Sequence, residues 1–74
     1  MARIEVASEV AGTVWQLAAE VGDRLAEGGA ILVLESMKME IPVEAPRSGR
    51  LLELHVAVDD PVAEGQVVAV LDGD

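Results

Sequence analysis

The chain of 74 residues can hold one domain, residues 1–74, which would bury about 60 to 65% of the surface that its unfolded chain exposes. A formal net charge of -9 and a single aromatic residue, Trp15, exclude the basic surface and the stacking platforms of nucleic-acid-binding proteins. Because the chain has no cysteine, no apolar run of about 18 residues and no signal-peptide pattern, we expect a cytoplasmic protein without disulfides, thiolate metal sites or membrane spans.

The first elements in chain order are strands expected at residues 3–7 and 12–18. A helix is the rival interpretation of residues 14–25, where apolar residues recur at helical spacing. We reject the helix because Gly22 interrupts the pattern and because the matching segment later in the chain contains Pro61. Residues 8–11, between the two strands, do not determine which path the first strand takes.

Strands at residues 24–26 and 30–36 complete the first half of the chain. Between them Ala26-Glu27-Gly28 is typical of a tight turn, in which Gly28 would adopt a positive φ. Residues 36–39 then lead to a strand at residues 39–44, which contains Pro42. Since proline lacks an amide donor, this strand is expected at a sheet edge or with that side of Pro42 facing solvent.

The remaining strands, expected at residues 49–55, 61–63 and 67–72, repeat the first half. Residues 12–35 align without a gap onto residues 49–72 at an offset of 37, and nine of the 24 aligned pairs are identical. The identical pairs are Gly12/Gly49, Leu17/Leu54, Val21/Val58, Asp23/Asp60, Ala26/Ala63, Glu27/Glu64, Gly28/Gly65, Val33/Val70 and Leu34/Leu71. Gly22 is matched by Asp59, a residue that tolerates the left-handed conformation better than most.

This duplication predicts the fold class. Neither half can bury its apolar face alone, so the two halves are expected to pack face to face. The predicted fold is all-β: a flattened antiparallel sandwich or barrel of about eight short strands with an internal pseudo-twofold axis. Residues 36–39 join the halves and would project as a hairpin, with both termini at the opposite end.

Lys38 lies at this junction and is the only lysine of the chain, so chemistry that requires a primary side-chain amine has one site. It lies in the hexapeptide Glu35-Ser36-Met37-Lys38-Met39-Glu40, where two methionines flank the amine. Methionine is adaptable and common at protein contact surfaces, although these two could also close the end of the barrel. A solvated turn lysine is the ordinary alternative, but it does not explain a Met-flanked lysine at the centre of a duplicated fold.

The chain resembles the biotinyl domains of biotin-dependent carboxylases, and it is most similar to free-standing biotin/lipoyl attachment proteins. The matching segments are Gly12-Thr13-Val14, Val21-Gly22-Asp23, Ala26-Glu27-Gly28, Leu34 to Glu40, Ala45-Pro46 and Val67 to Val70, which together span nearly the whole chain. The resemblance implies a barrel-sandwich hybrid fold of the thumbless biotinyl type, since the uninterrupted repeat leaves no room for a thumb insertion.

The resemblance also implies a non-catalytic biotin carboxyl carrier, with biotin attached covalently to Lys38. Met37 and Met39 would assist recognition, and Glu35, Ser36 and Glu40 would contact the ligase. The implied partners are a biotin protein ligase, a biotin carboxylase and a carboxyltransferase acting on an acyl-CoA or similar acceptor, as in acetyl-CoA carboxylase. The isolated chain would be a monomer.

Two alternatives stay open for the modified residue. Lipoate could be attached to Lys38 instead of biotin or in addition to it, although lipoyl domains usually have Asp before the lysine and Ala after it. This chain has methionine on both sides. An unmodified interaction module, the third interpretation, would not require Lys38 at all.

Other side chains offer weaker candidates. His55 lies in an expected strand and is expected to be a partly exposed strand residue. One histidine without cysteine cannot form a metal site. Asp59 and Asp60 lack the clustered oxygen ligands of a calcium loop, and we expect no metal site. Trp15 aligns with Leu52 and is expected to pack between surface and core, with partner recognition as the weaker alternative.

Overall fold

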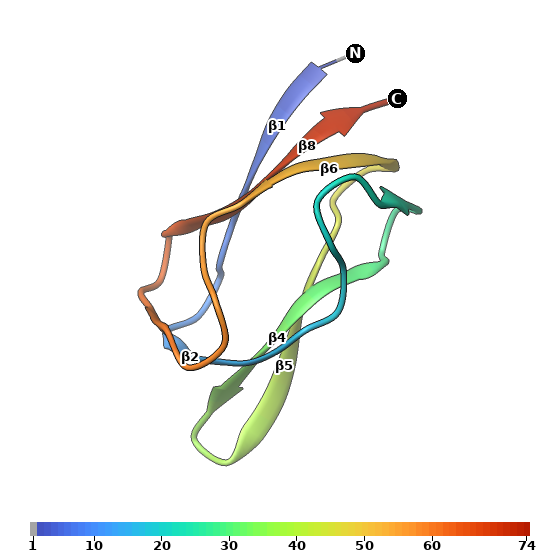
Figure 1. Cartoon of the computed structure of the whole chain (residues 1–74). Coiled ribbons are helices and arrows are strands. Elements are labelled where there is room, and N and C mark those ends of the chain that lie inside the picture. The colour runs from blue at the N-terminus through green and yellow to red at the C-terminus, as the bar shows by residue number, and fades with distance from the viewer. Residues whose placement is uncertain (1) are drawn as a thin grey trace.

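A computed structural model describes residues 2–74 and arranges eight strands in two four-stranded antiparallel sheets (Figure 1). The strands are β1 (Ala2–Ala7), β2 (Gly12–Leu17), β3 (Arg24–Leu25), β4 (Ala30–Ser36), β5 (Met39–Glu44), β6 (Gly49–Leu54), β7 (Pro61–Val62) and β8 (Val67–Gly73). The predicted all-β class is confirmed, and every expected strand end lies within one residue of the observed end. Among the described residues there is no helix that could cross a membrane.

The two sheets are repeat counterparts of each other. The terminal sheet has the order β1-β8-β6-β3, and the hairpin sheet has the order β5-β4-β2-β7. Each strand of one sheet corresponds, at the offset of 37 residues, to the strand at the same place in the other sheet. The duplication therefore reaches beyond the aligned residues and includes β1, whose counterpart is β5. Only Ile4/Ile41 and Val6/Val43 are identical between these two strands, so the sequence comparison missed the match.

Turns at matching places carry the residues that the sequence predicted for them. Gly22 has a φ of 99° and its counterpart Asp59 a φ of 77°, while Gly28 and Gly65 have φ values of 84° and 83°. This left-handed region is easily reached by glycine and tolerated by aspartate. The substitution of Asp59 for glycine thus preserves the turn and with it the repeat.

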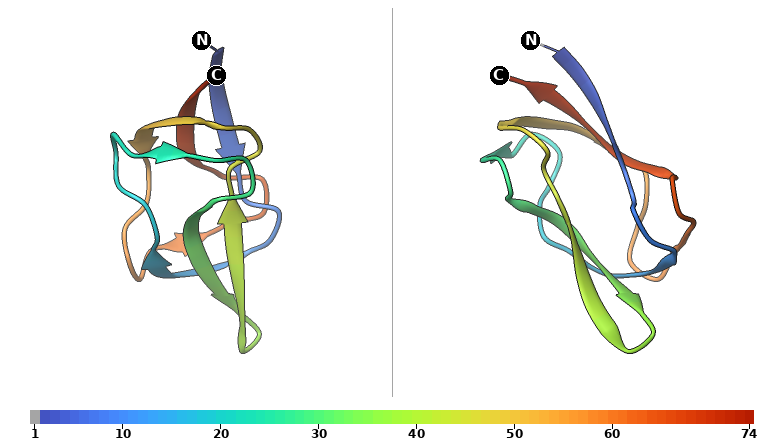
Figure 2. Two further views of the ribbon diagram at one scale, coloured as in Figure 1. Left: turned by 90° about the vertical axis from the view of Figure 1, so that its right-hand side faces the viewer. Right: turned by 180° about the vertical axis from the view of Figure 1, so that it is seen from behind.

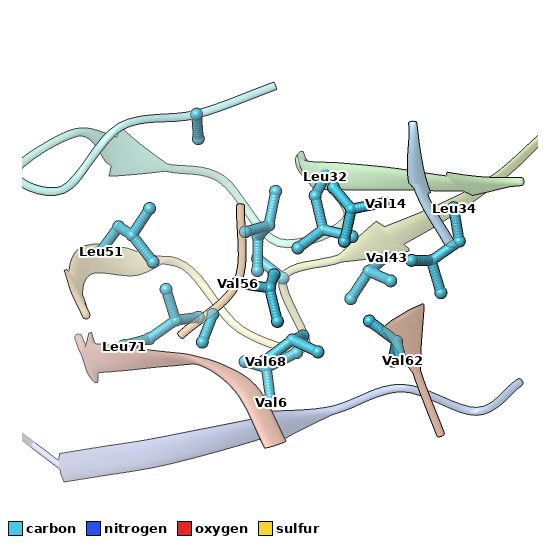
Figure 3. Packing of buried hydrophobic residues seen from close by; sticks show 14 residues of the cluster. Val6, Val14, Leu32, Leu34, Val43, Leu51, Val56, Val62, Val68 and Leu71 are labelled. Carbon is cyan, nitrogen blue, oxygen red and sulfur yellow. The ribbon is translucent and has the colours of Figure 1, made fainter. Parts of the chain in front are cut away.

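Both sheets contribute one face to a shared apolar core (Figure 3). Side chains alternate along the strands, so that β1 and β5 each bury one residue within the sandwich, Val6 and Val43. The residues of the core cluster are Val6, Val14, Ala19, Ile31, Leu32, Leu34, Val43, Ala45, Leu51, Val56, Val62, Val68, Ala69 and Leu71. As predicted from Pro42, β5 is an edge strand.

The molecule is elongated, with extents of 35 × 19 × 18 Å. The β4–β5 hairpin projects at one end, and the N- and C-termini lie side by side at the other (Figure 2). Ala2 pairs with Gly73 across β1 and β8, which holds the two ends of the chain together. The predicted separation between the projecting hairpin and the termini is confirmed.

Candidate attachment site

The hairpin turn consists of Met37 and Lys38, between the paired residues Ser36 and Met39. Met37 has a φ of 51° and Lys38 a φ of 66°, so both residues of this two-residue turn are left-handed. Such turns match the twist of the flanking strands, but left-handed backbone costs residues with a Cβ about 1–2 kcal/mol each. The turn is held in this conformation by the ladder between β4 and β5, which continues through Glu35/Glu40, Leu34/Ile41 and Val33/Pro42.

The side chains of the turn face solvent. Met37 is 93% exposed and Met39 is 63% exposed, and Lys38 is exposed between them. Methionines this exposed bury too little area to close the end of the barrel, which leaves contact with another molecule as the better account of them. Among residues 2–74 no ion pair and no side-chain hydrogen bond engages the Lys38 amine. A ligand can therefore reach this amine without first displacing a protein group.

Strand β2 supports the base of the hairpin through its pairing with β4. Thr13 pairs with Glu35, and Gly12 continues this line toward Ser36. A Cβ at Gly12 would lie 2.7 Å from the carbonyl oxygen of Glu35 and 3.3 Å from the Cβ of Ser36. The absence of a side chain at Gly12 thus lets β2 approach β4 closely, two residues before Lys38. Sequence reasoning missed this contact, although the identity of Gly12 and Gly49 was its signal.

The hexapeptide predicted from the sequence is therefore one continuous surface. The structure places Ser36 half-buried at the base of the turn and Glu35 opposite Glu40, both exposed. These two carboxylates flank the turn on adjacent strands. Lys38 is the only cationic side chain in this segment.

Other candidates from the sequence lie away from the turn. Asp60 accepts a hydrogen bond from the amide of Ala57 at 2.9 Å, as its counterpart Asp23 does from the amide of Glu20. These carboxylates cap turns, and no group of three or more metal-binding side chains occurs among the described residues. Asp60 and Asp23 thus have the same local role in the two halves of the chain.

His55 lies one residue beyond the end of β6 and not within the strand, which corrects the expected strand end. Its Nε2 atom lies 2.8 Å from the carboxylate of Glu53, which also accepts a hydrogen bond from Arg3 at 2.8 Å. The hydrogen bonds from His55 and Arg3 hold the pKa of Glu53 below its usual value of 4.5. This cluster belongs to the terminal sheet, far along the chain from Lys38.

Concave surface near the hairpin contains one buried polar side chain. A groove of about 290 Å³ lies between residues 7–10 and residues 41–46. Its one buried polar side chain, Ser8, donates a hydrogen bond to the carbonyl oxygen of Val10 at 2.6 Å and so has a partner. No buried side-chain polar atom of the described residues lacks a hydrogen bond. The arrangement presents an exposed amine on a two-residue turn at the end of a paired hairpin.

The chain is similar to known proteins over nearly its whole length. Residues 3–71 match the family model described as "Biotin-requiring enzyme". The chain is 41% identical over 66 residues to the biotin/lipoyl attachment protein of Bacillus subtilis (strain 168), covering 89% of this chain and 90% of that protein. It is 36% identical over 67 residues to the biotinylated protein TB7.3 homolog of Mycobacterium leprae (strain TN), covering 90% of this chain and 94% of that protein.

Among solved structures, the fold is similar to part of the Kluyveromyces lactis urea carboxylase, with a TM-score of 0.92 and 32% sequence identity. The match covers 97% of this chain but only 6% of the urea carboxylase chain. The similarity therefore concerns one small domain of a much longer protein.

Proposed function

The chain belongs to the biotin/lipoyl attachment family of non-catalytic, biotin-requiring carriers, and from that premise we propose that it carries carboxyl groups on a biotin joined to Lys38. The observation that carries the proposal is the place of the only lysine. It lies exposed on a left-handed two-residue turn, at the end of the molecule opposite the termini. No other residue of the chain offers a side-chain amine for an amide bond.

Attachment requires a nucleophilic amine and an activated acyl group. The neutral Nζ atom of Lys38 attacks the carbonyl carbon of an activated biotinyl group that a biotin protein ligase holds. An amide bond forms, the leaving group departs with its bonding electrons, and the amine gives up a proton. Loss of this positive charge makes the formal net charge one unit more negative than -9.

Met37, Lys38 and Met39 fit this reaction without rearrangement. The exposed amine has no competing partner among the described residues, and the ladder of the hairpin holds the backbone on both sides of the turn. Docking of a fixed hairpin loses less conformational entropy than docking of a disordered loop. The exposed methionines provide adaptable apolar contacts on both sides of the amine.

When attached, biotin supplies a ureido nitrogen that a biotin carboxylase loads with the use of ATP and bicarbonate and that a carboxyltransferase unloads onto an acyl-CoA or similar acceptor. The contribution of this chain is delivery. Its hairpin holds the tether at the surface, where it raises the effective concentration of the attached group at each enzyme.

Intact mass spectrometry after coexpression with a biotin protein ligase tests the attachment. The wild-type chain should gain one biotin-sized mass, and Lys38→Arg should gain none while keeping its circular dichroism spectrum. An unmodified wild-type chain in the presence of an active ligase would sink the proposal. A lipoyl-sized gain with a lipoate ligase would instead favour the lipoyl carrier.

Carboxyl transfer needs a second measurement. The modified chain, incubated with a biotin carboxylase, ATP and labelled bicarbonate, should acquire label that a carboxyltransferase then moves to an acyl-CoA. Lys38→Arg should acquire none. A modified chain that never takes up label would limit the function to attachment.

A further inference from the structure

The outer face of the hairpin sheet carries a row of apolar side chains. In β2 a bulge places both Trp15 and Gln16 opposite Val33, and Trp15 is 45% exposed. Val33 faces outward, because both of its neighbours in β4 point into the core. Pro42, exposed on β5, pairs directly with Val33. Trp15, Val33 and Pro42 thus lie on three adjacent strands and form what we call the outer row.

The duplicated fold provides its own comparison for this row. The counterparts in the terminal sheet are Leu52, Val70 and Glu5, aligned by the same bulge and the same pairing. The fold therefore accepts leucine in place of Trp15 and glutamate in place of Pro42. Val70 is completely buried, whereas its counterpart Val33 is only half-buried.

Because leucine, Leu52, stands at the counterpart of Trp15, the fold itself does not require a tryptophan at this place. Its position on the sheet that carries Lys38 points to contact with another molecule. Tryptophan is among the residues most enriched at the energetic centres of protein interfaces.

The two sheets also differ in charge: the strands of the hairpin sheet are acidic, and those of the terminal sheet are balanced. The strands of the hairpin sheet contain no basic residue and three glutamates, Glu35, Glu40 and Glu44. The strands of the terminal sheet balance three basic residues against three acidic ones, which are Arg3, Arg24, Arg50, Glu5, Glu53 and Asp72. The apolar outer row is therefore bordered by negative charge, and biotin on Lys38 would remove the positive charge at the nearby turn.

The outer row is continuous with the attachment turn. The next outward-facing pair along the hairpin is Glu35/Glu40, and the turn with Lys38 follows. From Pro42 to Met39, the residue next to Lys38, the strand advances about 10 Å at the usual rise of about 3.4 Å per residue. A partner that covered this row would hold the modified lysine at a fixed distance from its own surface.

We propose that Trp15, Val33 and Pro42 form the surface through which the biotinylated chain docks on biotin carboxylase, in an apolar depression bordered by lysine and arginine side chains. This inference rests on the proposed function. An enzyme that binds ATP and bicarbonate, both anions, gathers positive charge around its active site, and the acidic border of the row complements that charge. The ligase, by contrast, is expected to contact the segment from Glu35 to Glu40 and not the outer row.

The test is steady-state carboxylation with the biotinylated chain as the varied substrate and the biotin carboxylase subunit from the same source as the enzyme. Trp15→Leu installs the residue that the fold already accepts at the counterpart position. We expect the KM for this variant to rise about tenfold, as for loss of one interface anchor, with kcat unchanged. Leu52→Ala, the matched control on the terminal sheet, should leave the KM unchanged.

Salt dependence tests the acidic border separately. The KM of the wild-type chain should rise with ionic strength, and Glu40→Gln should weaken this dependence. Glu5→Gln on the terminal sheet should not weaken it. Equal effects of the two substitutions would overturn the assigned border.

Ligase kinetics separate this inference from the function on which it rests. Trp15→Leu should be biotinylated at the wild-type rate, with its folding followed by circular dichroism. An unchanged KM, or equal slowing of biotinylation and carboxylation, would overturn the docking surface while the attachment at Lys38 still stood. An effect confined to the carboxyltransferase would also overturn it. If the wild-type chain is not biotinylated at all, the proposed function fails first and this inference with it.

Discussion

Gly12 and Gly49 provide a paired test of how β2 supports the attachment turn. Alanine at Gly12 would bring a Cβ within 2.7 Å of the Glu35 carbonyl oxygen, at the base of the hairpin. Alanine at Gly49, the repeat counterpart, would approach the carbonyl oxygen of Asp72 still more closely and lie 3.0 Å from the Cα of Gly73. The first clash lies beside Lys38 and the second beside the C-terminus.

The size of each effect follows from these distances. Contacts under 3.0 Å are repulsive, so β4 must move by roughly 0.5 Å in Gly12→Ala, and β8 must move further in Gly49→Ala. Overpacking of this kind lowers the free energy of unfolding by about 1–3 kcal/mol, of which the reduced entropy of the unfolded chain returns about 0.4–1 kcal/mol. Gly49→Ala should be the less stable variant, because its Cβ meets more backbone atoms at shorter range.

Modification should rank the same two variants in the opposite order. A shift at Glu35 and Ser36 is passed to Lys38 through two residues, and small misplacements of a reacting group slow reactions strongly. We expect Gly12→Ala to be biotinylated roughly 3- to 10-fold more slowly than the wild-type chain, and Gly49→Ala at the wild-type rate.

Urea unfolding followed by the fluorescence of Trp15 gives the stabilities, and timed intact mass spectrometry gives the modification rates. Rates must be compared under conditions in which both variants are folded. If the two variants slow modification equally, or if stability and modification fall in the same order, the support that we assign to Gly12 is refuted.

Two further predictions concern the turn and the terminal sheet. Met39→Ala should slow biotinylation or carboxyl transfer severalfold but change the free energy of unfolding by less than about 0.5 kcal/mol, because Met39 is largely exposed; equal losses in kinetics and in urea midpoint would favour a packing role. Because the pKa of Glu53 is lowered in the folded state, ionised Glu53 stabilises the fold at pH values above its usual pKa of 4.5. This stabilisation is lost as the pH falls through the lowered pKa. Glu53→Gln should therefore reduce the drop in urea midpoint between about pH 6 and pH 3, and an unchanged drop would contradict the hydrogen bonds from His55 and Arg3.

Much of the fold could be predicted because turn chemistry repeats in the sequence. Gly28 and Gly65 occupy left-handed turns, and Asp59 replaces Gly22 because aspartate tolerates the same backbone. Pro42 indicated an edge strand for the simple reason that it cannot donate to a ladder. These residues constrain the backbone locally, so their effect can be read without knowledge of their neighbours in space.

Other features depend on contacts between distant segments. The bulge at Trp15 arises from the pairing of β2 with β4, and it turns Trp15 outward where simple packing between surface and core was expected. The path of β1 depends on its pairing with β8, which its own residues do not signal. Lys38 could be singled out from composition and symmetry, whereas its role as the attachment residue stays a prediction until the modified chain is weighed.

The termini and the turn with Lys38 lie at opposite ends of a body 35 Å long. Rotation of the domain about its termini would therefore move the turn over a long distance. A chain held at Ala2 and Gly73 would pivot there, and its turn would sweep an arc with a radius near the full length of the domain. A biotin arm on Lys38 would add only to the end of that radius. Fusion to another protein at either terminus would thus leave the working end unobstructed, so one body could serve equally as a separate shuttle or as a swinging segment of a larger enzyme.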